Sequence, residues 1–257
     1  MSVDMGRSYF EYTFVSPKER VQLFCFHYAG GSALSYGWLS EYLPDWISIF
    51  PYQLPGRGGR IHDRYPESII EAAHEASLAI KSELRCPFIL MGHSMGGMIA
   101  AVTASVLERE HGLIPERLFL TAAVPDFEKS SKANGVLMTG LDDEGFCRCL
   151  IEFGAIDSRI FRIKSFREDY LPLIRSDFRI AEAYALRERI SAGISAYAGS
   201  SDRIVRPEDI EMWKDISDDV SIRIMSGGHF FTKEHMEEIC RDIASFAENR
   251  PSVGGSL

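Results

Sequence analysis

The sequence predicts an α/β fold in which a mostly parallel central sheet is flanked by helices. Two observations support this prediction: short apolar runs alternate with segments of helical spacing, and glycine-rich turns follow several of the runs. Strands that alternate with helices build parallel sheets, because each helix returns the chain across a face of the sheet. With 257 residues, of which 46% are hydrophobic, the chain can bury a sizeable core.

The expected elements follow that alternation in order. The first apolar run, "VQLFCF", leads into the turn "HYAGGSA", and the second leads into the loop "YQLPGRGGR". The run "FILM" stops at a glycine, after which small and apolar residues recur at helical spacing from Met95 onward. The predicted strands are residues 21–26, 46–51, 88–91, 117–123, 190–197 and 220–225, and a helix is predicted at 68–84.

Residues 128–189 differ from this alternation. Charged residues interleave with apolar ones at helical spacing, and no convincing strand pattern occurs. A helical lid inserted over one end of the sheet and a set of additional core helices both fit this pattern. We interpret the chain as a single domain, residues 1–257, with a helical lid at 128–189 and a flexible tail at 251–257.

Composition and charge exclude several classes of function. The net charge of −9 argues against nucleic acid as a partner. No apolar run approaches the roughly 18 residues of a membrane span, and the N-terminus lacks a secretion signal. The five cysteines are scattered and do not have zinc-site spacing. We therefore expect a cytoplasmic protein with free thiols and no metal.

The pentapeptide "GHSMG" (92–96) fits the nucleophile-elbow motif G-x-S-x-G. A strand-like run precedes it and a small-residue helix follows. The tight turn requires glycine at Gly92 and Gly96, where side chains would clash with the neighbouring elements. It would raise the Oγ of Ser94 above the sheet, at the positive end of the following helix. The sequence thus marks Ser94 as a candidate nucleophile.

A serine nucleophile needs a base and an acid, and both follow in the required order. His229 lies in "MSGGHFF", after the last predicted strand, and is the best-placed base. Asp202 lies in "GSSDRIV", after the penultimate strand, and is the favoured acid. Asp126 in "AAVPDF" is the rival acid, because it also follows a strand.

The reaction also needs two donors for the oxyanion. The backbone N–H of Met95, next to Ser94, is the first candidate. The turn "HYAGGSA" supplies the second, and the N–H of Ala29 is its best-placed donor. Small residues in this turn let the backbone approach a reacting carbonyl.

With these residues in place, the sequence resembles the type II thioesterases of nonribosomal peptide and polyketide pathways, which have the α/β-hydrolase fold. Six stretches carry the resemblance in order over nearly the whole chain: "LFCFHYAGGSALSY", "YQLPGRGGR", "GHSMGG", "LPLIRSDFRIAEAY", "GSSDRIV" and "GGHFF". The family's triad corresponds to Ser94, Asp202 and His229, and its oxyanion donors to the backbones of Ala29 and Met95.

The resemblance implies an enzyme that removes aberrant or stalled acyl groups from the phosphopantetheine arm of acyl or peptidyl carrier proteins. It further implies an acyl-enzyme on Ser94, no cofactor and a monomer. A medium-chain acyl-carrier thioesterase of fatty acid synthesis, and a carboxylesterase or acyltransferase on the same fold, are the alternatives. A non-enzymatic binding protein is disfavoured, because all three triad positions are filled.

Substrate and carrier contacts are harder to locate. Relatives usually read Pro-His where this chain has His27-Tyr28, so we expect Tyr28 to affect the shape of the substrate site. Phe146, Phe153 and Phe161 of the lid are candidates for lining an acyl pocket. Core packing explains their helical spacing equally well.

Carrier proteins are commonly acidic, so a local basic patch would have to attract them to this acidic chain. Three arginines occur close together in and after the loop "YQLPGRGGR". A solvated loop that uses arginine for solubility or turn structure explains them equally well. The predicted carrier-binding residues are Arg57, Arg60 and Arg64.

Overall fold

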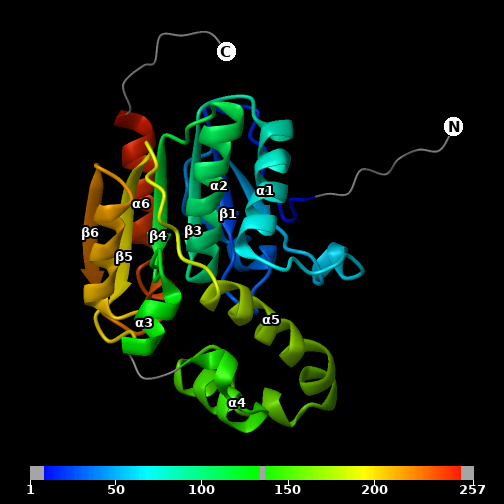
Figure 1. Ribbon diagram of the computed structural model, residues 1–257. Helices are drawn as coiled ribbons and strands as arrows, with labels where there is room; N and C mark the ends of the chain where they lie inside the picture. The colour runs from blue at the N-terminus through cyan, green and yellow to red at the C-terminus, as the bar shows by residue number, and fades with distance from the viewer. Residues whose placement is uncertain (1–8, 134–136, 250–257) are drawn as a thin grey trace, which may run out of the picture.

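A computed structural model describes residues 9–133 and 137–249 of the protein. Six strands form one sheet in the order β2-β1-β3-β4-β5-β6, and every neighbouring pair is parallel (Figure 1). The predicted α/β fold with a parallel central sheet is confirmed. The strands are β1 (Val21–Phe26), β2 (Ile47–Tyr52), β3 (Phe88–His93), β4 (Arg117–Thr121), β5 (Gly193–Gly199) and β6 (Val220–Met225).

Helices cover both faces of the sheet. In β1, Phe24 and Phe26 pack with α1 and α2, whereas Leu23 and Cys25 pack in the cluster that includes α6. Successive residues of a strand point to opposite faces, so a strand buried on both faces is apolar throughout. Figure 1 shows α1 and α2 side by side on one face. The three helices are α1 (Ile69–Glu83), α2 (Met95–His111) and α6 (Met236–Asn249).

The strand order creates a crevice at the carboxyl end of the sheet. From β1 the chain moves outward to β2, and it then returns to form β3 on the other side of β1. The loops that leave β1 and β3 therefore diverge, and parallel sheets bind ligands at such a switch point. Phe26 of β1 is paired with Gly92 of β3, so the turn "HYAGGSA" and Ser94 emerge beside one another.

The segment that joins β4 to β5, called here the β4–β5 segment (122–192), is predominantly helical. It has its own apolar cluster, built around Phe146, Leu150 and Ile174. In Figure 1, α4 and α5 lie beyond the carboxyl end of the sheet. Its elements are α3 (Phe127–Ala133), η4 (Met138–Gly140), α4 (Asp143–Glu152), η5 (Ile160–Arg162), η6 (Phe166–Tyr170) and α5 (Leu171–Glu182).

The division into one domain with a lid at 128–189 stays a prediction, and the tail at 251–257 lies outside the described residues. Within those residues, the β4–β5 segment contains no strand, only an isolated bridge between Asp126 and Ala185. None of the helices formed by residues 9–133 and 137–249 is both long and apolar enough to cross a membrane.

Candidate active site

The turn from β3 to α2 holds Ser94 in an unusual backbone conformation. Its φ is 56° and its ψ is −123°, and its amide donates to the carbonyl of Thr121 at 2.8 Å. A Cβ at Gly92 would lie 2.2 Å from the carbonyl oxygen of Gly96, and one at Gly96 would lie 2.0 Å from that of Phe26. Only glycine allows this close approach. The Oγ of Ser94 does not cap α2, which leaves it available to the site.

The loops after β5 and β6 are joined to each other. The amide of Ser201 donates to the carbonyl of Gly227 at 2.9 Å. A Cβ at Gly199 would lie 2.3 Å from the carbonyl oxygen of Gly228, so the two backbones touch there. Gly227 has a φ of +117°, a conformation that favours glycine. These contacts bring the loop after β5 beside the one after β6, although the two are distant in sequence.

Ser94, His229 and Asp202 form a chain of hydrogen bonds. The Oγ of Ser94 lies 2.9 Å from Nε2 of His229, and Nδ1 of His229 lies 2.8 Å from Oδ2 of Asp202. The other carboxylate oxygen of Asp202 accepts from the amides of Ile204 and Val205 at 2.8 and 3.1 Å. In this arrangement Nδ1 carries the proton and Nε2 can accept one from the serine. The three residues are only 5–7% exposed.

Asp126, the rival acid, has other partners. Its Oδ1 accepts from the amide of Lys129 at 2.9 Å, which is a cap on α3. Its Oδ2 forms an ion pair with Arg187 at 2.7 Å. The carboxylate that faces His229 therefore belongs to Asp202.

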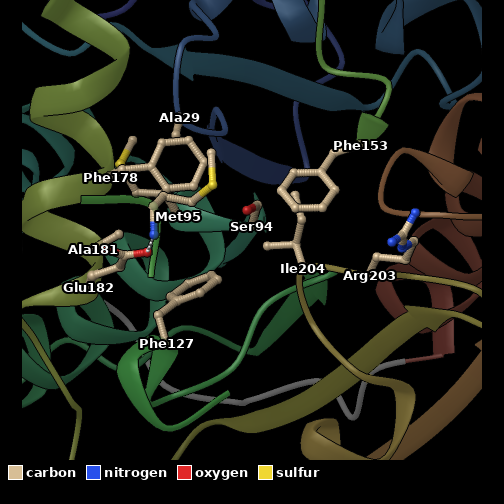
Figure 2. Close-up of a pocket in the computed structure, with 11 residues that line it drawn as sticks. Ala29, Ser94, Met95, Phe127, Phe153, Phe178, Ala181, Glu182, Arg203 and Ile204 are labelled. Carbon is tan, nitrogen blue, oxygen red and sulfur yellow. Dashed lines mark hydrogen bonds between the residues drawn. The ribbon is translucent and has the colours of Figure 1, made fainter. Parts of the chain in front are cut away.

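Ala29 and Met95 line the same pocket as Ser94 (Figure 2). Met95 is the first residue of α2, where backbone N–H groups lack partners within the helix. Among the described residues, we find no hydrogen bond made by the amide of either residue. Two donors beside Ser94 are thus available to an oxygen bound in the pocket.

Aromatic side chains surround Ser94 in this pocket. Figure 2 shows Phe127, Phe153 and Phe178 around it, together with Ile204. The cavity volume is only about 20 Å³, which is close to the room that one water molecule needs. An acyl group larger than that can enter only if the surrounding side chains move.

Of the residues predicted to contact substrate, some line cavities near Ser94 and others do not. Phe153 lines the pocket, as the sequence analysis proposed, and Tyr28 lines two neighbouring cavities. The prediction is wrong for Phe146, which is fully buried in the apolar cluster of the β4–β5 segment. Phe161 packs partly buried against that cluster and does not line the pocket beside Ser94.

The predicted basic patch is not formed as expected. Arg57 and Arg60 are 3% and 4% exposed, so this prediction is wrong for both. Arg57 is paired with Asp177, and Arg60 with Glu75. Arg64 is exposed but forms ion pairs with two glutamates close to it in sequence. Buried, neutralised arginines cannot attract a partner, and a role of Arg64 toward a carrier stays a prediction.

Two further histidines lie near the site and are held neutral. Burial, together with the nearby charge of Arg57, lowers the pKa of His27 to about 3. Burial holds the pKa of His93 well below its usual range, and the charges of His229 and Lys233 act in the same direction. Both pKa values lie below the range in which an enzyme base works, so neither histidine competes with His229.

We expect the neutral His27 to make stability depend on pH. Its pKa is about 3 when folded and about 6.5 when unfolded, so the unfolded chain binds the extra proton between those values. Stability is therefore lost as pH falls from 6.5 toward 3, by roughly 1 kcal/mol per pH unit. Asn in place of His27 retains a donor toward the carbonyl of Tyr28 without titrating.

Urea unfolding at pH 7, 6 and 5 measures the effect. The free energy of unfolding of His27→Asn should fall less steeply with acidity than that of the wild type. Because both proteins share their other titrating groups, the difference between the slopes isolates His27. Equal slopes would contradict the prediction.

No metal ligand cluster occurs in the part of the chain that the structure describes. Within 9–133 and 137–249, no three side chains of histidine, cysteine, aspartate or glutamate converge as ligands would. Cys147 and Cys149 of the C-x-C sequence carry free thiols. The polar groups that converge at the crevice are instead those of the Ser94–His229–Asp202 chain.

Comparison with known proteins agrees with the geometry of the site. The thioesterase domain family matches residues 21–246, which is most of the chain. The protein belongs to this thioesterase family. The family match includes the elbow, both loops that carry Asp202 and His229, and the β4–β5 segment.

Several relatives of this thioesterase are similar over most of their length. Thioesterase PikA5 of Streptomyces venezuelae is 32% identical over 235 residues, which cover 89% of this chain and 82% of PikA5. The human medium-chain S-acyl fatty acid synthase thioesterase is 27% identical over 239 residues, or 89% and 87% of the two chains. The type II thioesterase BorB from the borrelidin biosynthetic cluster superimposes with a TM-score of 0.77 at 28% identity, covering 91% and 94%.

Proposed function

We propose that this thioesterase hydrolyses acyl groups from the phosphopantetheine arm of carrier proteins and acts as an editing, type II enzyme. The observation that carries the proposal is the hydrogen-bonded series Ser94–His229–Asp202, with distances of 2.9 and 2.8 Å, at the base of an apolar pocket. The series supplies a nucleophile, a base and an acid in one line. The description of BorB as a type II thioesterase from the borrelidin biosynthetic cluster supports this class of enzyme.

The proposed acylation begins when the Oγ of Ser94 attacks the thioester carbonyl while its proton passes to Nε2 of His229. The carbonyl oxygen becomes an oxyanion, which accepts from the amides of Ala29 and Met95. Collapse of this intermediate breaks the C–S bond and leaves the acyl group on Ser94. The departing sulfur takes the proton from His229, which returns to its neutral form. A thiol has a pKa of about 8.5, so this departure needs little assistance from an acid.

Deacylation repeats the steps with water. His229 takes a proton from a water molecule, whose oxygen attacks the acyl-serine carbonyl. The second oxyanion accepts hydrogen bonds from the same two amides. When it collapses, His229 returns its proton to the Oγ of Ser94. Asp202 holds the imidazole with Nδ1 protonated in both halves and stabilises its charged form. The products are a carboxylic acid and the free enzyme.

The shape of the site supports a substrate that brings a long arm. A larger groove, open to solvent and with a volume of about 630 Å³, shares Ala29 with the small pocket at Ser94. The β4–β5 segment supplies most of its apolar walls, among them Ile156, Ile160 and Phe166. We propose that this segment acts as a lid, and that its movement opens the pocket at Ser94 to the acyl group.

Two alternative functions keep the same chemistry. The similarity to the human medium-chain thioesterase favours, as the second candidate, the release of medium-chain acyl groups in fatty acid synthesis. An oxygen-ester substrate fits the same two oxyanion donors, because esters and thioesters pass through similar tetrahedral intermediates.

A panel of substrates with matched acyl groups tests the proposal. We expect kcat/KM for acyl-carrier proteins to exceed that for the same acyl group on coenzyme A or on a simple alcohol by about tenfold or more, which corresponds to about 1.4 kcal/mol. Mass spectrometry of each carrier before and after exposure measures the loss of the acyl group. Short, aberrant acyl groups should be removed as readily as medium-chain ones.

Each contrary result selects an alternative. A clear preference for the free oxygen ester would overturn the thioesterase proposal in favour of a carboxylesterase. A sharp optimum at medium chain length, with short groups retained on the carrier, would replace editing by the fatty acid function. The Ser94→Ala variant provides the blank for every substrate.

A further inference from the structure

A buried ion pair links the turn "HYAGGSA" to α5. Arg57 and Asp177 have side chains only 3% and 2% exposed, and two hydrogen bonds of 2.7 Å join the guanidinium to both carboxylate oxygens. Oδ2 of Asp177 also accepts from the amide of Gly30 at 2.8 Å. Nη1 of Arg57 also donates to the carbonyl of Gly31 at 3.0 Å. The pair thus holds together three segments that are far apart in sequence.

The polar backbone groups that follow Ala29 all have partners. The amide of Gly30 donates to Asp177, and its carbonyl accepts from the hydroxyl of Tyr170 at 2.8 Å. The amide of Gly31 donates within the turn at 2.8 Å, and its carbonyl accepts from Arg57. The amide of Ala29, by contrast, has no hydrogen bond among the described residues. The turn is therefore held at Gly30 and Gly31, next to Ala29, which lines the pocket with Ser94.

Packing also couples the turn to α5. Gly30 has a φ of +75°, and a Cβ there would lie 2.9 Å from Cγ1 of Ile174, one turn before Asp177 on the same helix. The backbone of the turn therefore rests directly on α5. Any displacement of α5 would move Asp177, which accepts from the Gly30 amide, and would take from Arg57 the carboxylate that orients it toward the Gly31 carbonyl.

We propose that Arg57 and Asp177 are positioning residues for the oxyanion hole, and that they make its Ala29 donor depend on the docking of α5. Neither side chain needs to touch the substrate. Stability alone does not account for this ion pair, because the cost of burying two charges offsets much of their attraction. The two parallel hydrogen bonds instead fix the orientation of both side chains, and these in turn hold the backbone of Gly30 and Gly31. Oxyanion stabilisation requires donors held about 3 Å from the developing charge.

This proposal rests on the proposed function only in taking Ser94 as the nucleophile. It gives the β4–β5 segment a second role besides covering the pocket, because Asp177 of α5 supports the oxyanion hole. When α5 is displaced, the second donor loses its anchors. Hydrolysis would then be efficient only when the segment is closed over a bound substrate.

The test is Asp177→Asn, assayed with a small thioester and with an activated oxygen ester of the same acyl group. We expect kcat to fall about 10- to 100-fold with both substrates while KM changes less than about threefold, since loss of a whole oxyanion donor costs about 10²–10³. The inhibition constant of a trifluoromethyl ketone, which forms a tetrahedral adduct with the serine, should rise in parallel with the fall in kcat/KM.

Glu75→Gln is the matched control. Glu75 pairs with the buried Arg60 through two hydrogen bonds, at 2.7 and 2.9 Å, in the same region but without contact to the turn. It should lower the thermal midpoint, by less than Asp177→Asn because the side chain of Glu75 is 35% exposed, while kcat stays within about twofold of the wild type. Arg57→Lys is a second variant in case Asp177→Asn does not fold. It retains the positive charge but cannot donate to both carboxylate oxygens at once, and should lower kcat about fivefold.

The outcomes separate this proposal from a structural role and from the proposed function. Wild-type kcat in Asp177→Asn, or in Arg57→Lys if the first variant is unfolded, would overturn the positioning role. An equal loss of kcat in Glu75→Gln would also overturn it. A wild-type enzyme that prefers the oxygen ester would overturn the thioesterase proposal alone, because the ratio of variant to wild type still reports on the oxyanion hole.

Discussion

Ser94→Ala should reduce turnover of an acyl-carrier substrate by about five to six orders of magnitude, the scale seen when a serine nucleophile is removed from a triad. No other hydroxyl lies at 2.9 Å from Nε2 of His229 in the described residues. Alanine has a Cβ like serine, so the positive φ of 56° strains both side chains equally and the fold should persist. Quantification of acyl carrier by mass spectrometry, at high enzyme concentration, measures the residual rate.

Two controls accompany this variant. Ser77→Ala removes a buried hydroxyl of α1 that donates to the carbonyl of His74 and does not line the pocket beside Ser94, and it should leave turnover within about twofold. Binding of acyl carrier to Ser94→Ala should remain close to that of the wild type, because the substitution removes little contact area. Substantial turnover by folded Ser94→Ala would require a different nucleophile.

Strands β1, β2, β3 and β5 were predictable because all of their residues are buried. All six residues of β1 and of β2 are buried, so each appears in the sequence as an apolar run. Their ends were less predictable. The expected strand at 190–197 begins only at Gly193, because the amide of Ile190 donates to the carbonyl of Ile216 outside the sheet. Tyr52 and His93 extend their strands beyond the predicted ends through pairing that no local pattern reveals.

The site was partly predictable for a related reason. The elbow is a local motif, and the loops after the last strands of a parallel sheet must meet at its carboxyl edge. The partners of the arginines are not local, since 120 residues separate Arg57 from Asp177. The sequence shows a charge but not whether a distant carboxylate neutralises it. Phe127 and Phe178 were missed because helical spacing does not tell which apolar side chain faces a pocket rather than the core.

Asp202→Asn should lower kcat/KM by about 10⁴ near neutral pH while the protein stays folded. Oδ1 of Asp202 accepts from the amides of Ile204 and Val205, so the oxygen of an asparagine side chain is required on that side. Its NH₂ group must then face Nδ1 of His229, which lies 2.8 Å from Oδ2 in the wild type. The imidazole is forced to accept there and to carry its proton on Nε2, where it can no longer take the proton of Ser94.

Asp126→Asn distinguishes the two candidate acids. Asparagine retains the cap on Lys129 but weakens the ion pair with Arg187, which is largely exposed, so we expect a loss of at most about 1 kcal/mol in the free energy of unfolding and little change in kcat/KM. Kinetics and urea unfolding of both variants, measured side by side, decide the assignment. A larger kinetic loss in Asp126→Asn would mean that the imidazole turns toward a different carboxylate during turnover. The two backbone donors on Asp202 argue against this, because they hold one carboxylate oxygen in place and leave the other directed at His229.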